Sequence, residues 1–183
     1  MLFIAFAVLS LLLLFLLNKK PISRNSVPQN PVVSNVAPGL PVRLTIPTIN
    51  VNAAIEQVGI APSGEMDVPA STVDVAWFKL GYRPGEKGSA VISGHVDGKN
   101  GEPAVFINLY KLKKGDTLYI EDDKGTSIAF VVRESRTYNP GYAEEVFTVN
   151  DTAHVNLVTC DGVWDGAKKS YSKRLVVFAD ISH

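Results

Sequence analysis

Six short runs rich in β-branched and aromatic residues, separated by turn signals, constrain the fold of this chain more than any other feature. The runs lie at 41–60, 89–95, 116–122, 126–138, 154–160 and 174–180. Several alternate apolar with polar residues, the two-residue period of a half-buried strand. Turn signals such as Pro84-Gly85 and Asn139-Pro140-Gly141 separate them. No long amphipathic helix is evident, and only 104–112 has the pattern of a short helix. The sequence therefore predicts an all-β fold, either an antiparallel barrel or a sandwich.

The first 17 residues are apolar throughout, with one Ser and no charged side chain. As a helix they would extend about 26 Å, near the lower limit for crossing the core of a bilayer. No small-residue cleavage site follows them, which favours an uncleaved anchor over a cleaved signal segment. Lys19 and Lys20 oppose an exported orientation, because basic residues after a span favour the cytoplasmic side. We nevertheless expect a membrane segment at 1–17 with the main domain exported.

The rest of the chain divides into a spacer and one domain. Residues 18–41 contain five prolines and no acidic residue, a composition typical of an extended, semi-rigid spacer. Residues 42–183 are long enough to enclose one sizeable core. They carry 15 Lys and Arg against 18 Asp and Glu, a net charge of −3, with no basic stripe. This balance argues against nucleic acid as a partner.

Cys160 is the only cysteine, so the chain forms no intrachain disulfide. Within 154–160, strand alternation places Val155, Leu157 and Thr159 on one face and Cys160 on the other. If the first face packs into the core, the thiol points out of the core. On this evidence alone, an inert structural cysteine and a reactive one remain equally open.

A reactive thiol needs a base or a cationic partner. His154 shares the face of Cys160 but lies six residues away, about 20 Å along an extended strand, which is out of reach. His95 instead ends an apolar run beside a glycine-containing turn, where functional groups are often found. Arg174 opens the last run after an expected loop at 161–173, so pairing of the two runs would bring it to the same loop as Cys160. A solvated surface charge is the alternative interpretation for Arg174.

The segments VISGH, ending at His95, and VNLVTC, ending at Cys160, together with the Arg174 that opens RLVVFAD, resemble the sortases. Sortases are cysteine transpeptidases of Gram-positive cell surfaces. The run from VISGHVDG to GDTLYI is most similar to class F or class E/F members. The resemblance covers nearly all of residues 42–183 and implies a closed eight-stranded β-barrel with short helices. Asn156 departs from it, because many class A members have Thr at that motif position.

The resemblance implies a function and a set of site residues. Cys160 would be the nucleophile, His95 the general acid and base, and Arg174 the group that positions substrate and binds the oxyanion. Cys160 would cleave an LPxTG-like sorting signal between Thr and Gly, forming a thioester. An amine of a cell-wall precursor or a pilin lysine would then accept the acyl group. The candidate groove contacts are Thr159, Asp161, Trp164 and Tyr171, of which the last three lie at 161–173.

The resemblance also implies a location and a set of partners. We expect a single-pass protein of the cell membrane, with its catalytic domain outside the cytoplasm. Its partners would be sorting-signal peptides, an amine acceptor, and the membrane through residues 1–17. No acidic cluster like the calcium site of class A is evident, so we expect no metal and no cofactor.

Three other interpretations can be compared with this one. An L,D-transpeptidase would carry Arg two residues after its cysteine, where this chain has Gly162. A surface thiol endopeptidase would differ only in that water outcompetes the amine. A non-catalytic anchored surface module would make Cys160 incidental, and Cys160→Ala would then leave its biology intact.

Overall fold

The computed structural model describes residues 37–182 except 142, 149 and 150. The expected membrane segment at 1–17 and nearly all of the spacer lie outside the described residues. Within the described part, no helix combines the length and apolarity needed to cross a membrane. The account below therefore concerns the domain that follows the spacer.

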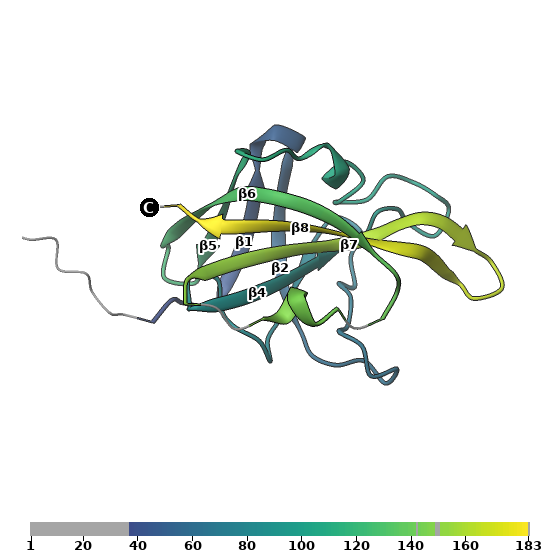
Figure 1. Ribbon diagram of the computed structural model, residues 1–183, viewed down its shortest axis with the longest axis horizontal. Helices are drawn as coiled ribbons and strands as arrows, with labels where there is room; N and C mark the ends of the chain where they lie inside the picture. The colour runs from purple at the N-terminus through teal and green to yellow at the C-terminus, as the bar shows by residue number, and fades with distance from the viewer. Residues whose placement is uncertain (1–36, 142, 149–150, 183) are drawn as a thin grey trace, which may run out of the picture. The chain divides into compact units, whose positions relative to one another are not determined.

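Eight strands close into one barrel, in the order β1-β2-β3-β4-β7-β8-β6-β5 (Figure 1). The strands are β1 (Pro41–Ile46), β2 (Val51–Val58), β3 (Val75–Phe78), β4 (Gly88–Gly94), β5 (Thr117–Asp122), β6 (Ser127–Tyr138), β7 (Ala153–Asp165) and β8 (Ser170–Ile181). Short 3-10 helices are η1 (Pro47–Ile49), η2 (Leu109–Lys111) and η3 (Glu144–Phe147). The all-β expectation and the closed eight-stranded barrel are confirmed.

The barrel is not purely antiparallel, however. β2 pairs with β3 in parallel, and so does β4 with β7. The sequence also failed to indicate β3, because its four residues are nearly all buried and show no alternation of apolar and polar side chains. The alternation rule detects strands with one wet face, so a short strand covered on both faces gives no such signal.

The core fills the inside of the barrel with alternate side chains from its strands. Val155 and Leu157 of β7 are fully buried there, so the predicted core face of this strand is confirmed. The same alternation places the following side chains inside: Leu44 and Ile46 of β1, Leu118 and Ile120 of β5, Phe130 and Val132 of β6, and Val177 of β8.

The outer face of β4, β7 and β8 is covered rather than solvated. Val91, Val176 and Phe178 form a second apolar cluster with Val146 of η3. Asn156 is buried on this side, and its Nδ2 donates a hydrogen bond to the carbonyl oxygen of Val146 at 2.7 Å. The residues that alternate out of the core on β7 therefore face the segment containing η3.

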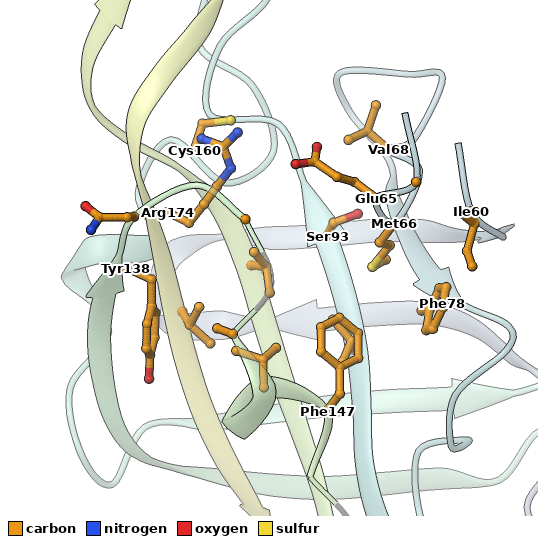
Figure 2. Close-up of a pocket in the computed structure, with 18 residues that line it drawn as sticks. Ile60, Glu65, Met66, Val68, Phe78, Ser93, Tyr138, Phe147, Cys160 and Arg174 are labelled. Carbon is orange, nitrogen blue, oxygen red and sulfur yellow. The ribbon is translucent and has the colours of Figure 1, made fainter. Parts of the chain in front are cut away.

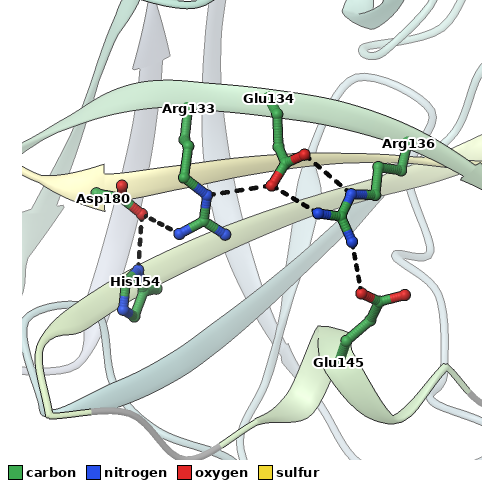
Figure 3. A network of polar contacts seen from close by, with 6 residues as sticks. All are labelled: Arg133, Glu134, Arg136, Glu145, His154 and Asp180. Atoms are coloured by element: carbon green, nitrogen blue, oxygen red, sulfur yellow. Dashed lines mark hydrogen bonds and ion pairs between the residues drawn. The ribbon is translucent and has the colours of Figure 1, made fainter.

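A network of charged side chains ties the same segment to β6 (Figure 3). Arg136 pairs with Glu134 at 2.9 Å and with Glu145 of η3 at 2.7 Å. At the other end of the network, Asp180 of β8 accepts from Arg133 and contacts His154, each at 2.8 Å. The network crosses three strands and holds η3 against the barrel.

The prediction of a loop at 161–173 is wrong. In the structure β7 and β8 extend into this segment and form a hairpin that projects beyond the barrel (Figure 1). Cross-strand pairing resumes at Trp164 with Tyr171 after an irregularity that follows Asp161. Gly162 lies in this irregularity with φ of +82°, a conformation that favours glycine. The Asp161-Gly162 pair therefore marks a bulge within a strand, although in sequence it has the appearance of a strand end.

Candidate active site

Cys160 and Arg174 occupy paired positions on β7 and β8. Hydrogen bonds from the guanidinium hold it at the base of the hairpin. Its Nη1 donates to the carbonyl oxygens of Tyr171 at 3.1 Å and Lys173 at 2.9 Å, and its Nη2 donates to the Ser170 hydroxyl at 3.3 Å. The β8 strand and its turn thus place a permanent positive charge beside the thiol.

His95 follows the end of β4, the other strand beside β7, and lines the same pocket as Cys160. β4 and β7 run parallel, with Ser93 paired to Val158. Extending this register by two residues, one residue past the end of β4, brings His95 level with Cys160. Thr159 fastens the two strands at this point, because its buried hydroxyl donates to the carbonyl oxygen of Gly94 at 2.8 Å. Cys160 therefore lies between a strand that carries an imidazole and a strand that carries a guanidinium.

The imidazole of His95 has a defined orientation. Its Nε2 lies 2.8 Å from the carbonyl oxygen of Pro69, which can only accept a hydrogen bond, so Nε2 is the protonated nitrogen. The backbone beneath it is held closely, since a Cβ on Gly94 would lie 2.5 Å from the ring of Phe106. Glycine at this position lets the chain pass Phe106 and lets His95 emerge at the end of β4.

Burial raises the pKa of the Cys160 thiol above its ordinary value. Arg174 opposes this effect because its positive charge stabilises the thiolate, whereas the carboxylate of Asp97 reinforces it. The balance leaves the pKa raised, so at neutral pH the thiol is mainly protonated. Nucleophilic attack then requires a group that removes the thiol proton, and the geometry offers His95 for that task.

Two pockets meet at the thiol. The first, called here the apolar pocket, has a volume of about 500 Å³ and ends at Cys160 and Arg174 (Figure 2). Its walls are mainly hydrophobic and come from β3, β4, β7, β8, the end of β6 with the chain that leads to η3, η3 itself, and the segment between β2 and β3. Representative members are Ile60, Met66, Phe78, Val91, Val146 and Phe147.

The second pocket, called here the His95 pocket, has a volume of about 670 Å³ and differs in character. It is lined by His95, Asp97 and Lys99 from the loop after β4 and by Trp164 and Tyr171 from the hairpin. Among the residues that the structure describes, Cys160 is the one that lines both pockets. The thiol therefore lies at the junction of an apolar space and a space with charged and aromatic walls.

The hairpin is attached to the loop after β4 across the His95 pocket. The Tyr171 hydroxyl donates a hydrogen bond to Oδ2 of Asp97. This bond, together with burial and the negative charge of Asp97, raises the pKa of Tyr171 to about 12. The rings of Trp164 and Tyr171 meet edge to face, with centroids 5.3 Å apart. The contact between Tyr171 and Asp97 fixes one wall of the pocket relative to the other.

Of the four groove residues predicted from the sequence, two line a pocket and two do not. Trp164 and Tyr171 line the His95 pocket. Thr159 and Asp161 line neither pocket: Thr159 is buried between strands, and the carboxylate of Asp161 lies 3.4 Å from the Thr137 hydroxyl. His154, excluded on distance, lies at the start of β7 and contacts Asp180.

Sequence reasoning missed Asp97, which it treated only as part of a turn. The signal was its position two residues after His95 in the run GHVDG. Sequence reasoning also missed the walls of the apolar pocket, because η3 and the segment between β2 and β3 contain no residues with obvious chemistry. In the part of the chain that the structure describes, no three His, Cys, Asp or Glu side chains converge as they would to hold a metal ion.

Comparison with known proteins connects this arrangement to a family. A model of the sortase domain matches residues 44–182. Sortase C-1 from Actinomyces oris is 24% identical with a TM-score of 0.63, over 78% of this chain and 73% of that one. A lid mutant of sortase A from Corynebacterium diphtheriae is 21% identical with a TM-score of 0.63, over 81% and 73%. A search of curated protein sequences found no significant match.

Sortase C1 from Streptococcus agalactiae is also similar, at 24% identity and a TM-score of 0.61 over 78% of this chain and 68% of that one. These neighbours carry the names of sortases A and C, so the assignment to class F or E/F stays a prediction. The family itself rests on the match that spans most of the chain. This chain belongs to the sortase family of cysteine transpeptidases.

Proposed function

We propose that this sortase cleaves an LPxTG-like sorting signal between Thr and Gly through a thioester on Cys160. An amine of a cell-wall precursor or a pilin lysine then takes the acyl group. The observation that carries the proposal is the position of Cys160, level with His95, paired with Arg174 and exposed to both pockets. Two pockets at one thiol match a reaction that needs one substrate for each of its two steps.

The apolar pocket supports binding of the sorting signal. Its hydrophobic walls suit the Leu and Pro side chains of such a peptide. Its interior also contains Ser93, whose buried hydroxyl has no hydrogen-bond partner among the described residues. A peptide backbone in the pocket would supply that partner, which removes the cost of leaving the hydroxyl unpaired.

The three residues around the scissile bond have distinct tasks in this proposal. His95 takes the proton of Cys160, and the sulfur attacks the Thr carbonyl carbon. The guanidinium of Arg174 donates to the oxygen on which negative charge develops, a contribution typically worth about 10²–10³ in rate. The C–N bond then breaks, and His95 returns the proton to the leaving amine.

We further propose that residues 1–17 anchor the protein and that the catalytic domain acts outside the cytoplasm. The support is the apolar, uncharged composition of that segment and the Pro-rich spacer after it. A spacer of this kind keeps a domain at a distance from the bilayer surface. Protease accessibility of the domain in intact cells is the test, and protection of the domain from added protease would contradict the orientation.

The function is tested by incubating the purified protein with LPxTG-type peptides and an amine, with Cys160→Ala as the control. Mass spectrometry should detect the acyl group on Cys160 and the product in which Thr is joined to the amine. Absence of an adduct with every sorting-type peptide would contradict the enzyme proposal. Cleavage without transfer to the amine would favour the surface thiol endopeptidase.

A further inference from the structure

The His95 pocket has the features of a site for the second substrate. It meets the apolar pocket at Cys160, and the two pockets share no other residue among those that the structure describes. We propose that this pocket binds the acceptor amine and that Asp97 holds its ammonium group. The inference rests on the proposed function, because only a transpeptidase needs an acceptor site.

Asp97 is a fixed carboxylate with one oxygen available. Its Oδ2 accepts from Tyr171, and no described residue bonds to its Oδ1. The loop that carries it is braced, since Asp97 forms an isolated bridge with Pro103 and the Gly98 N–H donates to the Glu102 carbonyl oxygen at 2.8 Å. Asp97 is half-buried, so its charge is less screened than that of a surface carboxylate. A cation entering the pocket meets a preorganised acceptor.

The aromatic walls suit the rest of such an acceptor. Trp164 and Tyr171 present a pair of rings in edge-to-face contact on the hairpin side of the pocket. Rings of this kind pack against an alkyl chain and attract an ammonium group over their faces. Trp164 is 53% exposed, so about half of its surface is free for this contact. A primary amine on a flexible alkyl stem would satisfy Asp97 and the rings at once.

Lys99 also lines the pocket and would repel a cation. It is exposed, however, so solvent and salt screen its charge more than that of Asp97. An acceptor that bears a carboxylate next to its amine would pair with both residues. Two kinds of acceptor therefore fit the pocket. A protein lysine has no carboxylate next to its side-chain amine, whereas a diamino acid such as diaminopimelate has one.

The transfer step consumes the acceptor amine and releases Cys160 from the thioester. The acceptor ammonium loses one proton to solvent, and its neutral nitrogen attacks the thioester carbon. The C–N bond forms, the C–S bond breaks, and the electron pair of the C–S bond remains on sulfur as the Cys160 thiolate. The second nitrogen proton passes to His95, which had given up its proton to the first leaving amine. The imidazolium then returns this proton to the Cys160 sulfur, which restores the thiol and the neutral imidazole from which the cycle began.

The test measures how the acyl-enzyme divides between transfer and hydrolysis. The protein is supplied with a sorting-signal peptide and increasing amounts of a lysine-containing peptide or diaminopimelate, and both products are quantified. In Asp97→Asn, which keeps the acceptor for Tyr171, the amine concentration at which transfer equals hydrolysis should rise about tenfold. Both products arise from one thioester, so a changed acylation rate does not affect the ratio. The acceptor that transfers at the lower concentration identifies the source.

Three controls separate charge from structure. Glu102 lies on the same loop as Asp97 but does not line the pocket. The variant Glu102→Gln should therefore keep the wild-type ratio of transfer to hydrolysis. Hydroxylamine is uncharged at neutral pH, so with hydroxylamine as acceptor the ratio of transfer to hydrolysis should be the same in Asp97→Asn and wild type. Tyr171→Phe removes the contact across the pocket but keeps the charge of Asp97, so transfer should persist.

The proposal is overturned by an unchanged ratio for both ammonium acceptors in Asp97→Asn. An equal loss with hydroxylamine, or an equal loss in Tyr171→Phe, would also overturn it. A wild-type protein that forms no acyl-enzyme refutes the proposed function and this inference together. That result is distinct from the others, because in all of them hydrolysis of the thioester is observed.

Discussion

Cys160 on β7 and Arg174 on β8 are direct partners on adjacent antiparallel strands, which continue as a hairpin past the site. The register of the β-ladder therefore sets the separation of thiol and guanidinium. Hydrogen bonds to the carbonyl oxygens of Tyr171 and Lys173 then aim the guanidinium. A site built on paired strands keeps its geometry better than one built on a loop.

The thiol should titrate with the signs set by its neighbours. Burial raises the pKa of Cys160, so the midpoint of its alkylation rate against pH should lie above that of free cysteine. Arg174→Ala should move the midpoint higher, because the charge that favours the thiolate is lost. Asp97→Asn should move it lower, because an opposing charge is lost. Iodoacetamide inactivation across pH measures all three, and a lower midpoint in Arg174→Ala would contradict this account.

The two histidines of the barrel should differ in their effect on catalysis. His95→Ala should lower kcat/KM by about 10²–10⁴, the usual contribution of a general acid and base. His154→Ala should leave kcat/KM near the wild-type value, because His154 lies six residues before Cys160 on β7 and contacts Asp180. Peptide cleavage assays on both variants decide the matter, and the reverse ranking would refute the assignment of His95.

Thr159 should affect both stability and catalysis. Thr159→Val removes the hydroxyl that donates to the Gly94 carbonyl oxygen, leaving a buried acceptor unpaired at a cost of about 1–3 kcal/mol. Gly94 precedes His95, so kcat should fall as well. Thr137→Val on β6 is the matched control, since its hydroxyl makes only a long exposed contact of 3.4 Å. Denaturant unfolding should show a lower free energy of unfolding, and kinetic assays a lower kcat, for Thr159→Val than for Thr137→Val.

Asn156 should matter to the binding of the sorting signal. Its side chain holds the Val146 carbonyl oxygen, and Val146 lines the apolar pocket. Asn156→Ala should raise KM for the peptide and lower the free energy of unfolding by about 1–3 kcal/mol. Glu145→Gln, which weakens an exposed ion pair of the same segment, should cost at most about 1 kcal/mol. Equal KM values for Asn156→Ala and wild type would show that Asn156 does not support the pocket.

Asp122 at the turn between β5 and β6 should make stability depend on pH. Burial alone would raise the pKa of its carboxyl, but N–H donors from Thr126, Gly39 and Lys124 outweigh burial and lower it. Because the pKa of Asp122 is lower in the folded state, the carboxylate stabilises the fold fully when the pH is above the pKa of the unfolded chain, which is near 4. This stabilisation is lost as the pH falls through the pKa of the folded state. Asp122→Asn should therefore cost about 1–3 kcal/mol at pH 7 and less in acid, as measured by urea unfolding.

The alternating runs predicted an all-β fold, and the resemblance to the sortases supplied the closed barrel and the roles of His95 and Arg174. Alternation in 154–160 separated Val155 and Leu157 from Cys160, and the burial of those two residues confirms the division. It could not show that the opposite face of β7 is covered, because the cover comes from η3, whose contact with Asn156 spans ten residues of sequence. Burial of this kind depends on tertiary contacts that no local pattern encodes.

The hairpin shows a different limit. Asp161-Gly162 has the composition of a turn, but in the structure it occupies a bulge with positive φ inside β7. Local composition indicates which backbone conformation a residue adopts, and a bulge and a turn can require the same one. Only pairing between Trp164 and Tyr171 beyond that point distinguishes them.

Because Cys160 alone of the described residues lines both pockets, the remaining walls of each pocket can change independently. On the proposed assignment of the two pockets, substitutions in η3 or the segment between β2 and β3 should alter which peptide is cleaved, whereas substitutions at Trp164 and Tyr171 of the hairpin should alter which amine is joined to it. A chain with this layout can be re-engineered one substrate at a time. Ligation of a new peptide to an unchanged amine, or the reverse, then becomes a matter of exchanging one set of walls.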